Sequence, residues 1–204
     1  MKKNLKSNLL ILLGAVLILA SLGLTMYNLY EDDTAGRNTP DPDGIVQAGA
    51  VSSLAGYEEY IPDYELDPDF EMPAVEVDGR EYVGRLDIAR LGLSLPVLSE
   101  LTMANLKIAP ARYSGDAYDG NCIIGAHNYN SHFGRLKDLD EGDEVLFTDM
   151  DGNQFRYEVK RTDILDGYDV DGLNAGDWDM TLFTCTRGGK NRVTVRLGLI
   201  SEQA

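Results

Sequence analysis

Thr181-Leu182-Phe183-Thr184-Cys185 is an apolar, β-branched run that ends on a cysteine. A second β-branched run begins at Arg192. Both patterns are typical of buried strands, so we expect the thiol to lie on rigid backbone beside a fixed positive charge. The thiolate is the nucleophilic form of cysteine, and a nearby cation stabilises it. The two runs together indicate nucleophilic catalysis by Cys185.

A candidate base ends another apolar run, because Cys122-Ile123-Ile124-Gly125-Ala126 is followed directly by His127. The other histidine, His132, lies in a predicted loop-to-helix start. Catalytic groups are held best on rigid elements, so we prefer His127. Arg187 and Arg196 are alternatives for the cation. A cysteine, a histidine and an arginine, each carried by a strand, suggest acyl transfer through a covalent intermediate.

From Glu81 onward, short apolar runs alternate with turns. Residues 149–153 are interpreted as a hairpin turn, since an EF-hand calcium loop needs about twelve residues between two helices. Short helices are expected at 99–106 and 132–139. The fold class is therefore predicted as mainly β, a single closed or nearly closed β-barrel of about eight strands with short connecting helices. Strands are expected at 82–88, 93–98, 121–127, 144–148, 154–161, 181–185 and 192–200.

The N-terminus is predicted to be a membrane anchor. The basic segment 1–8 precedes an apolar segment at 9–30, and a helix of about 20 residues crosses a bilayer core. We prefer an uncleaved transmembrane helix to a cleaved signal peptide, because no convincing small-x-small site follows. Lysines before the helix and acidic residues after it predict that residues 1–8 are cytoplasmic and that residues 31–204 lie outside.

Residues 31–80 carry most of the formal net charge of −16, because 14 Asp and Glu residues are opposed only by Arg37 and Arg80. The segment also holds five of the seven prolines. We therefore expect an extended, self-repelling stalk, followed by a catalytic domain at 81–204. Nucleic acid is excluded as a partner, because no clustered basic face opposes this charge. The acidic loop 166–179 is expected to be solvated, and substrate selection by it is worth testing.

The Thr-Leu-Phe-Thr-Cys motif, the upstream Gly125-Ala126-His127 and the downstream Asn191-Arg192 resemble the signature of the sortases. These are membrane-anchored cysteine transpeptidases of Gram-positive bacteria. The resemblance covers residues 82–200 and implies a sortase-like barrel behind an anchor and a stalk. In this chain the glycine stands one place earlier, relative to the histidine, than is usual in the family. Asp67-Pro68-Asp69-Phe70 faintly resembles the lid of pilus-building sortases, but we assign it to the stalk.

The resemblance implies a role for each candidate residue. Cys185 attacks the threonine carbonyl of a sorting signal of the Leu-Pro-x-Thr-Gly kind and forms a thioester. His127 protonates the leaving amine and then deprotonates the incoming amine. Arg192 holds the substrate carbonyls or the developing oxyanion. Thr184 and Ala126, which directly precede two of these residues, are candidate substrate-binding residues.

The implied partners are surface proteins that carry a sorting signal, and an amine on a cell-wall precursor or a pilin-like protein. The chemistry needs no metal or organic cofactor. Two alternatives stay open. Two cysteines in an exported domain commonly form a disulfide, here Cys122–Cys185, which would leave a non-catalytic surface-anchored β-domain that binds a partner or wall polymer. A cysteine peptidase that uses water as acceptor is the other alternative.

Overall fold

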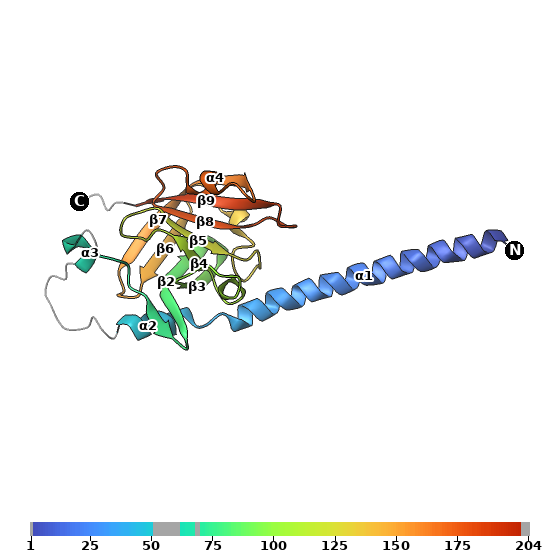
Figure 1. Cartoon of the computed structure of the whole chain (residues 1–204), viewed down its shortest axis with the longest axis horizontal. Coiled ribbons are helices and arrows are strands. Elements are labelled where there is room, and N and C mark those ends of the chain that lie inside the picture. The colour runs from blue at the N-terminus through green and yellow to red at the C-terminus, as the bar shows by residue number, and fades with distance from the viewer. Residues whose placement is uncertain (1, 51–61, 68–69, 201–204) are drawn as a thin grey trace. The chain divides into compact units, whose positions relative to one another are not determined.

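The structure is a computed structural model that describes residues 2–50, 62–67 and 70–200, in two units at 1–34 and 35–204. The first unit is formed by most of helix α1 (Lys2–Asn38), drawn in blue in Figure 1. Its large apolar side chains from Leu9 to Tyr30 are exposed. Within the described ranges, one helix near the N-terminus is long and apolar enough to cross a membrane.

The second unit is a closed β-barrel (Figure 1). Its sheet order is β1-β2-β3-β4-β5-β8-β9-β7-β6, and pairing of β2 with β6 closes a barrel of eight strands that β1 flanks. The predicted fold class is confirmed, with one strand more than expected. The strands of the described chain are β1 (Val75–Val77), β2 (Arg80–Ile88), β3 (Leu93–Leu98), β4 (Ala111–Ser114), β5 (Cys122–Ala126), β6 (Glu144–Asp149), β7 (Gln154–Asp166), β8 (Met180–Cys185) and β9 (Asn191–Leu199).

Short helices fill the connections of the barrel. The expected helix at 99–106 is wrong, because only a 3₁₀ turn forms at its end. Thr102 Oγ1 accepts a hydrogen bond from the backbone of Asn105 at 3.1 Å, and the Asn105 amide donates to the Glu100 carbonyl at 2.8 Å. Such local bonds compete with helix formation. The described helices after α1 are α2 (Pro42–Ala50), α3 (Asp63–Leu66), α4 (Val170–Asn174) and the 3₁₀ turns η1 (Ala89–Leu91), η2 (Asn105–Lys107) and η3 (Leu136–Asp138).

Part of the predicted stalk packs on the barrel and is not an extended linker. Ile45 of α2 is buried in one hydrophobic cluster with Tyr82 and Leu98 of the barrel. Asp43 of the same helix forms an ion pair with Arg85 on β2. The composition of the segment did not predict this contact, because it depends on the position of one isoleucine and one aspartate in a nine-residue helix.

A segment before the barrel, described at residues 62–67 and 70–72, packs against one end of it. The Tyr64 ring stacks on Tyr118 with 4.4 Å between ring centroids, and Met72 is buried in the main core. The Phe70 ring lies 6.1 Å from that of Tyr118. Tyr118 precedes β5, so this segment lies at the end where the parallel strands β5 and β8 begin. Cys185 ends β8, and Phe70 therefore does not cover it; residues 68–69 lie outside the described residues.

Asp149 organises the predicted hairpin between β6 and β7. Its carboxylate is fully buried and accepts hydrogen bonds from the backbone of Asp151 at 2.9 Å and of Asn153 at 2.8 Å. The Asn153 amide donates at 2.8 Å, and the Tyr118 hydroxyl donates at 2.7 Å. The turn thus uses its acidic residue to satisfy its own donors and to attach the loop before β5.

Replacing Asp149 with alanine should lower the free energy of unfolding by about 3 kcal/mol, since four partly buried donors lose their acceptor together. Urea denaturation checks this prediction. Asp138→Ala is the matched control, because this exposed carboxylate has one ion pair, and its loss should cost less than about 0.5 kcal/mol. Equal effects of the two variants would contradict the role of Asp149.

Candidate active site

Strand register places Cys185 opposite Arg192. β8 and β9 are antiparallel, and Cys185, the last residue of β8, pairs with Arg192 near the start of β9. Directly opposite residues have Cβ atoms about 5 Å apart and point to the same face of a sheet. The cysteine and the arginine are therefore neighbours by the geometry of the sheet, at the turn that joins the two strands.

His127 joins them from the other side of β8. β5 runs parallel to β8 and pairs Ala126 with Thr184, so His127 follows β5 just as Cys185 follows Thr184. Side chains alternate along a strand. Ala126 and Thr184 are buried. His127 and Cys185 therefore face outward, and Arg192 shares that face. The three residues predicted to be catalytic come together on one outer face at one end of the barrel.

Thr184 and Ala126 connect the two strands immediately before this site. The Thr184 hydroxyl donates to the Ala126 carbonyl at 2.9 Å. Both side chains are buried and turned toward the barrel interior. The hydroxyl is therefore already used within the sheet, and a substrate-binding role for the two residues stays a prediction. Their geometry suits a positional role, which is to fix the offset between β5 and β8.

The two histidines occupy different environments. The His127 ring is half-buried and lies 5.1 Å from the Tyr129 ring. His132 is fully buried, and its Nε2 is hydrogen-bonded to Thr39 Oγ1 at 3.0 Å. That hydroxyl also lies 3.0 Å from the Ile108 carbonyl oxygen, to which it can donate. His132 thus attaches the segment after α1 to the barrel and does not reach the outer face.

The three candidate arginines also differ. Arg192 Nη1 donates to the carbonyls of Gly189 at 3.2 Å and of Asn191 at 3.4 Å, both in its own turn. Arg192 forms no ion pair with any carboxylate of the described chain. Arg196 is buried, and its donors are used by carbonyls of another loop, so it is not available to a substrate. Arg187 is exposed in the β8–β9 turn.

Both cysteines are free, and the disulfide alternative is wrong. Cys122 begins β5 and pairs with Met180, at the opposite end of β8 from Cys185. Five strand residues span about 16 Å, whereas a disulfide needs Cα atoms within about 7 Å. Cys122 is also in the core, and burial raises the pKa of its thiol to about 12. It is a neutral, unreactive thiol at physiological pH.

An apolar surface lies beside the site on the same outer face. A Cβ at Gly125 would lie 2.5 Å from the Phe183 ring and 2.7 Å from the Leu101 side chain. The Tyr113 ring meets Phe183 edge-on at 5.9 Å. A side chain at position 125 would therefore clash with Phe183 and Leu101, which explains the glycine there. Residue 126 faces the core, where the alanine side chain fits. The sequence analysis noted the shifted glycine but not its contacts, and no local pattern predicted Leu101 or Tyr113.

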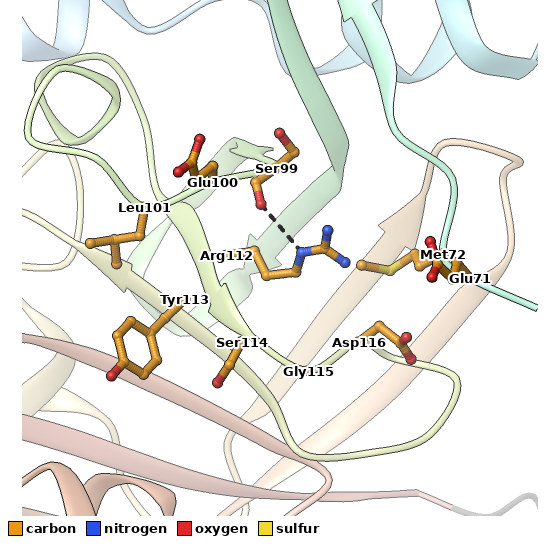
Figure 2. A pocket seen from close by; sticks show the side chains of 10 residues that line it. All are labelled: Glu71, Met72, Ser99, Glu100, Leu101, Arg112, Tyr113, Ser114, Gly115 and Asp116. Carbon is orange, nitrogen blue, oxygen red and sulfur yellow. Dashed lines mark hydrogen bonds between the residues drawn. The ribbon is translucent and has the colours of Figure 1, made fainter. Parts of the chain in front are cut away.

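A pocket of about 600 Å³ extends from this surface toward the end where β5 begins (Figure 2). Arg112 extends into it and donates from Nε to the Ser99 carbonyl at 3.3 Å. The pocket is lined by Glu71, Met72, Ser99, Glu100, Leu101, Arg112, Tyr113, Ser114, Gly115 and Asp116. The sequence did not predict this pocket, because its walls combine residues 71–72, 99–101 and 112–116, which only the fold brings together. Among the described residues, no group of three or more His, Cys, Asp and Glu side chains is placed to hold a metal.

Solved sortases have the same fold. A Clostridium perfringens sortase D5 transpeptidase is 22% identical, with a TM-score of 0.56 over 78% of this chain and 99% of that chain. Sortase C-3 from Streptococcus pneumoniae is 20% identical, with a TM-score of 0.55 over 85% and 91%. Sortase A from Corynebacterium diphtheriae is 18% identical, with a TM-score of 0.54 over 90% and 97%. At these identities the likeness is one of fold.

A family comparison adds evidence at the level of sequence. None of the curated proteins matches this chain. Residues 86–199 match the family described as Sortase domain. That range is more than half of the 204 residues, and it contains His127, Cys185 and Arg192. With its eight-stranded barrel and its N-terminal apolar helix, the chain belongs to the sortase family.

Proposed function

We propose that this protein is a transpeptidase that cuts a sorting signal of the Leu-Pro-x-Thr-Gly kind after its threonine and transfers the acyl part to an amine. The observation that carries the proposal is the register of β5, β8 and β9. It brings three groups to one outer face, namely the half-buried Cys185 thiol, the His127 imidazole and the Arg192 guanidinium. Among the described residues, this guanidinium forms no ion pair. That set of groups is sufficient for covalent acyl transfer.

The proposed reaction has two halves. The Cys185 thiolate attacks the threonine carbonyl carbon, a C–S bond forms, and Arg192 stabilises the oxyanion. The peptide C–N bond then breaks as His127 donates a proton to the departing amine, which leaves a thioester. In the second half His127 accepts the proton of the incoming amine. The amine attacks the thioester, the new amide bond forms, and the thiolate leaves.

We further infer that α1 anchors the enzyme in the membrane and that residues 31–204 lie outside the cytoplasm. Lysines precede the apolar segment and acidic residues follow it, which is the arrangement favoured by the positive-inside rule. On this placement the site meets exported surface proteins, and the amine comes from a cell-wall precursor or from another surface protein.

Mass spectrometry of the intact protein tests the proposal. After incubation with a panel of pentapeptide sorting signals, the mass of the acyl part should be found as a thioester on Cys185. Added triglycine should discharge this thioester as an amide. A protein modified by none of the peptides would contradict the transpeptidase, and discharge to the acid alone in the presence of amine would identify a peptidase.

Arg192→Ala should lower kcat by about 10²–10³-fold, because removal of a single oxyanion donor has an effect of this size. Steady-state kinetics with a cleavable peptide measure the loss. Arg187→Ala is the matched control, since it removes an exposed arginine from the same β8–β9 turn. Its kcat should stay close to that of the wild type. A large loss in Arg187→Ala with an active Arg192→Ala would move the role to Arg187.

A further inference from the structure

Arg196 is a buried cation outside the proposed catalytic set. The residue is 3% exposed, although arginine is rarely fully buried. Nη1 donates to the Leu173 carbonyl at 2.7 Å and to Thr181 Oγ1 at 3.0 Å, and Nη2 donates to the Gly172 carbonyl at 2.5 Å. The Asp163 carboxylate lies 4.0 Å from Nε. Arg196 thus connects β9 to the loop that precedes β8.

The loop 167–179 is attached to the barrel at its two ends, because Gly167 donates to the Lys190 carbonyl and residues 178–179 accept hydrogen bonds from the backbone of Asn121, Cys122 and Leu199. It contains α4, whose N-terminus is capped by Asp169, and a helix of five residues is not stable by itself. Leu173 is the buried side chain of this helix. Tyr168 and Val170 are 93% and 53% exposed. Between those ends, the hydrogen bonds that join α4 to the barrel in the described chain are donated by the guanidinium of Arg196.

Arg196 holds the loop on the same outer face as the active site. It pairs with Thr181, as Arg192 pairs with Cys185, and residues four apart in a strand point to one face. The two pairs are about 13 Å apart along the strands. The loop also begins beside Arg192, since Gly167 donates from its backbone to the Lys190 carbonyl at 2.9 Å and a Cβ at Gly167 would lie 3.3 Å from Arg192 Nη1.

We propose that Arg196 is a positioning residue that fixes the loop 167–179 as one wall of the site where the peptide substrate binds. This inference rests on the proposed transpeptidase function. An extended peptide that presents its carbonyl to Cys185 must lie on this outer face, where it meets the exposed side chains of Tyr168 and Val170. Fixing the loop before the substrate arrives reduces the ordering cost of binding. Arg196 then acts on substrate affinity and not on the chemical step.

Arg196→Met tests the proposal, since it keeps the length of the side chain and removes its donors. We expect faster amide hydrogen exchange at 168–178 and a KM about tenfold higher, as for the loss of hydrogen bonds to a charged group, with kcat within about threefold. Alkylation of Cys185 by iodoacetamide should keep its rate. Arg156→Met, which removes an exposed arginine from β7, should change none of these quantities.

Two further variants keep the test decisive. Arg196→Lys should restore part of the exchange protection and of the KM. Asp169→Ala removes the exposed cap of α4 without touching the barrel, and it should raise KM in the same direction even if Arg196→Met fails to fold. Unchanged exchange and KM, or a fall in kcat at constant KM, would overturn the proposal. If the wild type turns over no peptide, the proposed transpeptidase function is contradicted. Amide hydrogen exchange at 168–178 would still report whether Arg196 holds the loop in place.

Discussion

Cys185→Ala is expected to form no thioester with any sorting-signal peptide and to lower turnover by on the order of 10⁶-fold, as when the nucleophile is removed from residues that act as a unit. Alanine removes the sulfur and leaves β8 and its pairing with β9 unchanged, so the barrel should unfold at the same temperature as the wild type. Intact-mass spectrometry detects the thioester, and peptide cleavage measures turnover.

Cys122→Ala is the control for this experiment. Its thiol lies in the core, and the pKa raised by burial keeps the thiol neutral. We expect normal turnover with a modest loss of stability from the small cavity. In the native wild type, one thiol should react quickly with a disulfide reagent and the second only after unfolding. An inactive Cys122→Ala that folds normally, or an active Cys185→Ala, would remove Cys185 from the mechanism.

His127→Ala is expected to lower kcat/KM by about 10²–10⁴-fold, the usual contribution of a positioned general acid–base. Because His127 serves as acid in one half of the reaction and as base in the other, both formation and discharge of the thioester should slow. Single-turnover measurements with and without an added amine separate the two steps.

His132→Gln is the matched control, because the glutamine amide can replace the Nε2 contact with Thr39. We expect kcat/KM close to that of the wild type and a lower unfolding temperature, which reports the structural role of this buried ring. A catalytic defect in His132→Gln at normal stability, together with an active His127→Ala, would reassign the acid–base role to His132.

The proposed catalytic set could be predicted because its geometry is local to three strand ends. The Thr-Leu-Phe-Thr-Cys run has the alternation of a strand, and the same period sends Cys185 outward when Leu182 and Thr184 face the core. The parallel pairing of β5 with β8 was not visible in the sequence. Periodicity identifies strands, but pairing depends on contacts between residues that are far apart in the chain.

The segments before the barrel were predicted least well. The prediction of a stalk rested on the average composition of 31–80, which is rich in acidic residues and proline. In the structure, single apolar residues of this segment, such as Ile45, Tyr64 and Met72, pack on the barrel. The role of Arg196 was also hidden, because its partners are backbone carbonyls whose position depends on the folded loop. Burial of a charged residue becomes visible only when its acceptors have been placed.

The separation of the two cysteines has a consequence for the life of the enzyme under oxidising conditions. The sulfenic acid of an oxidised cysteine can condense with a second thiol, which in redox-sensor proteins often lies next to it. Cys122 is shut inside the barrel at the far end of β8. Peroxide damage to Cys185 can therefore be repaired only by a thiol from another molecule, and without such a reductant each oxidised enzyme proceeds toward irreversible loss.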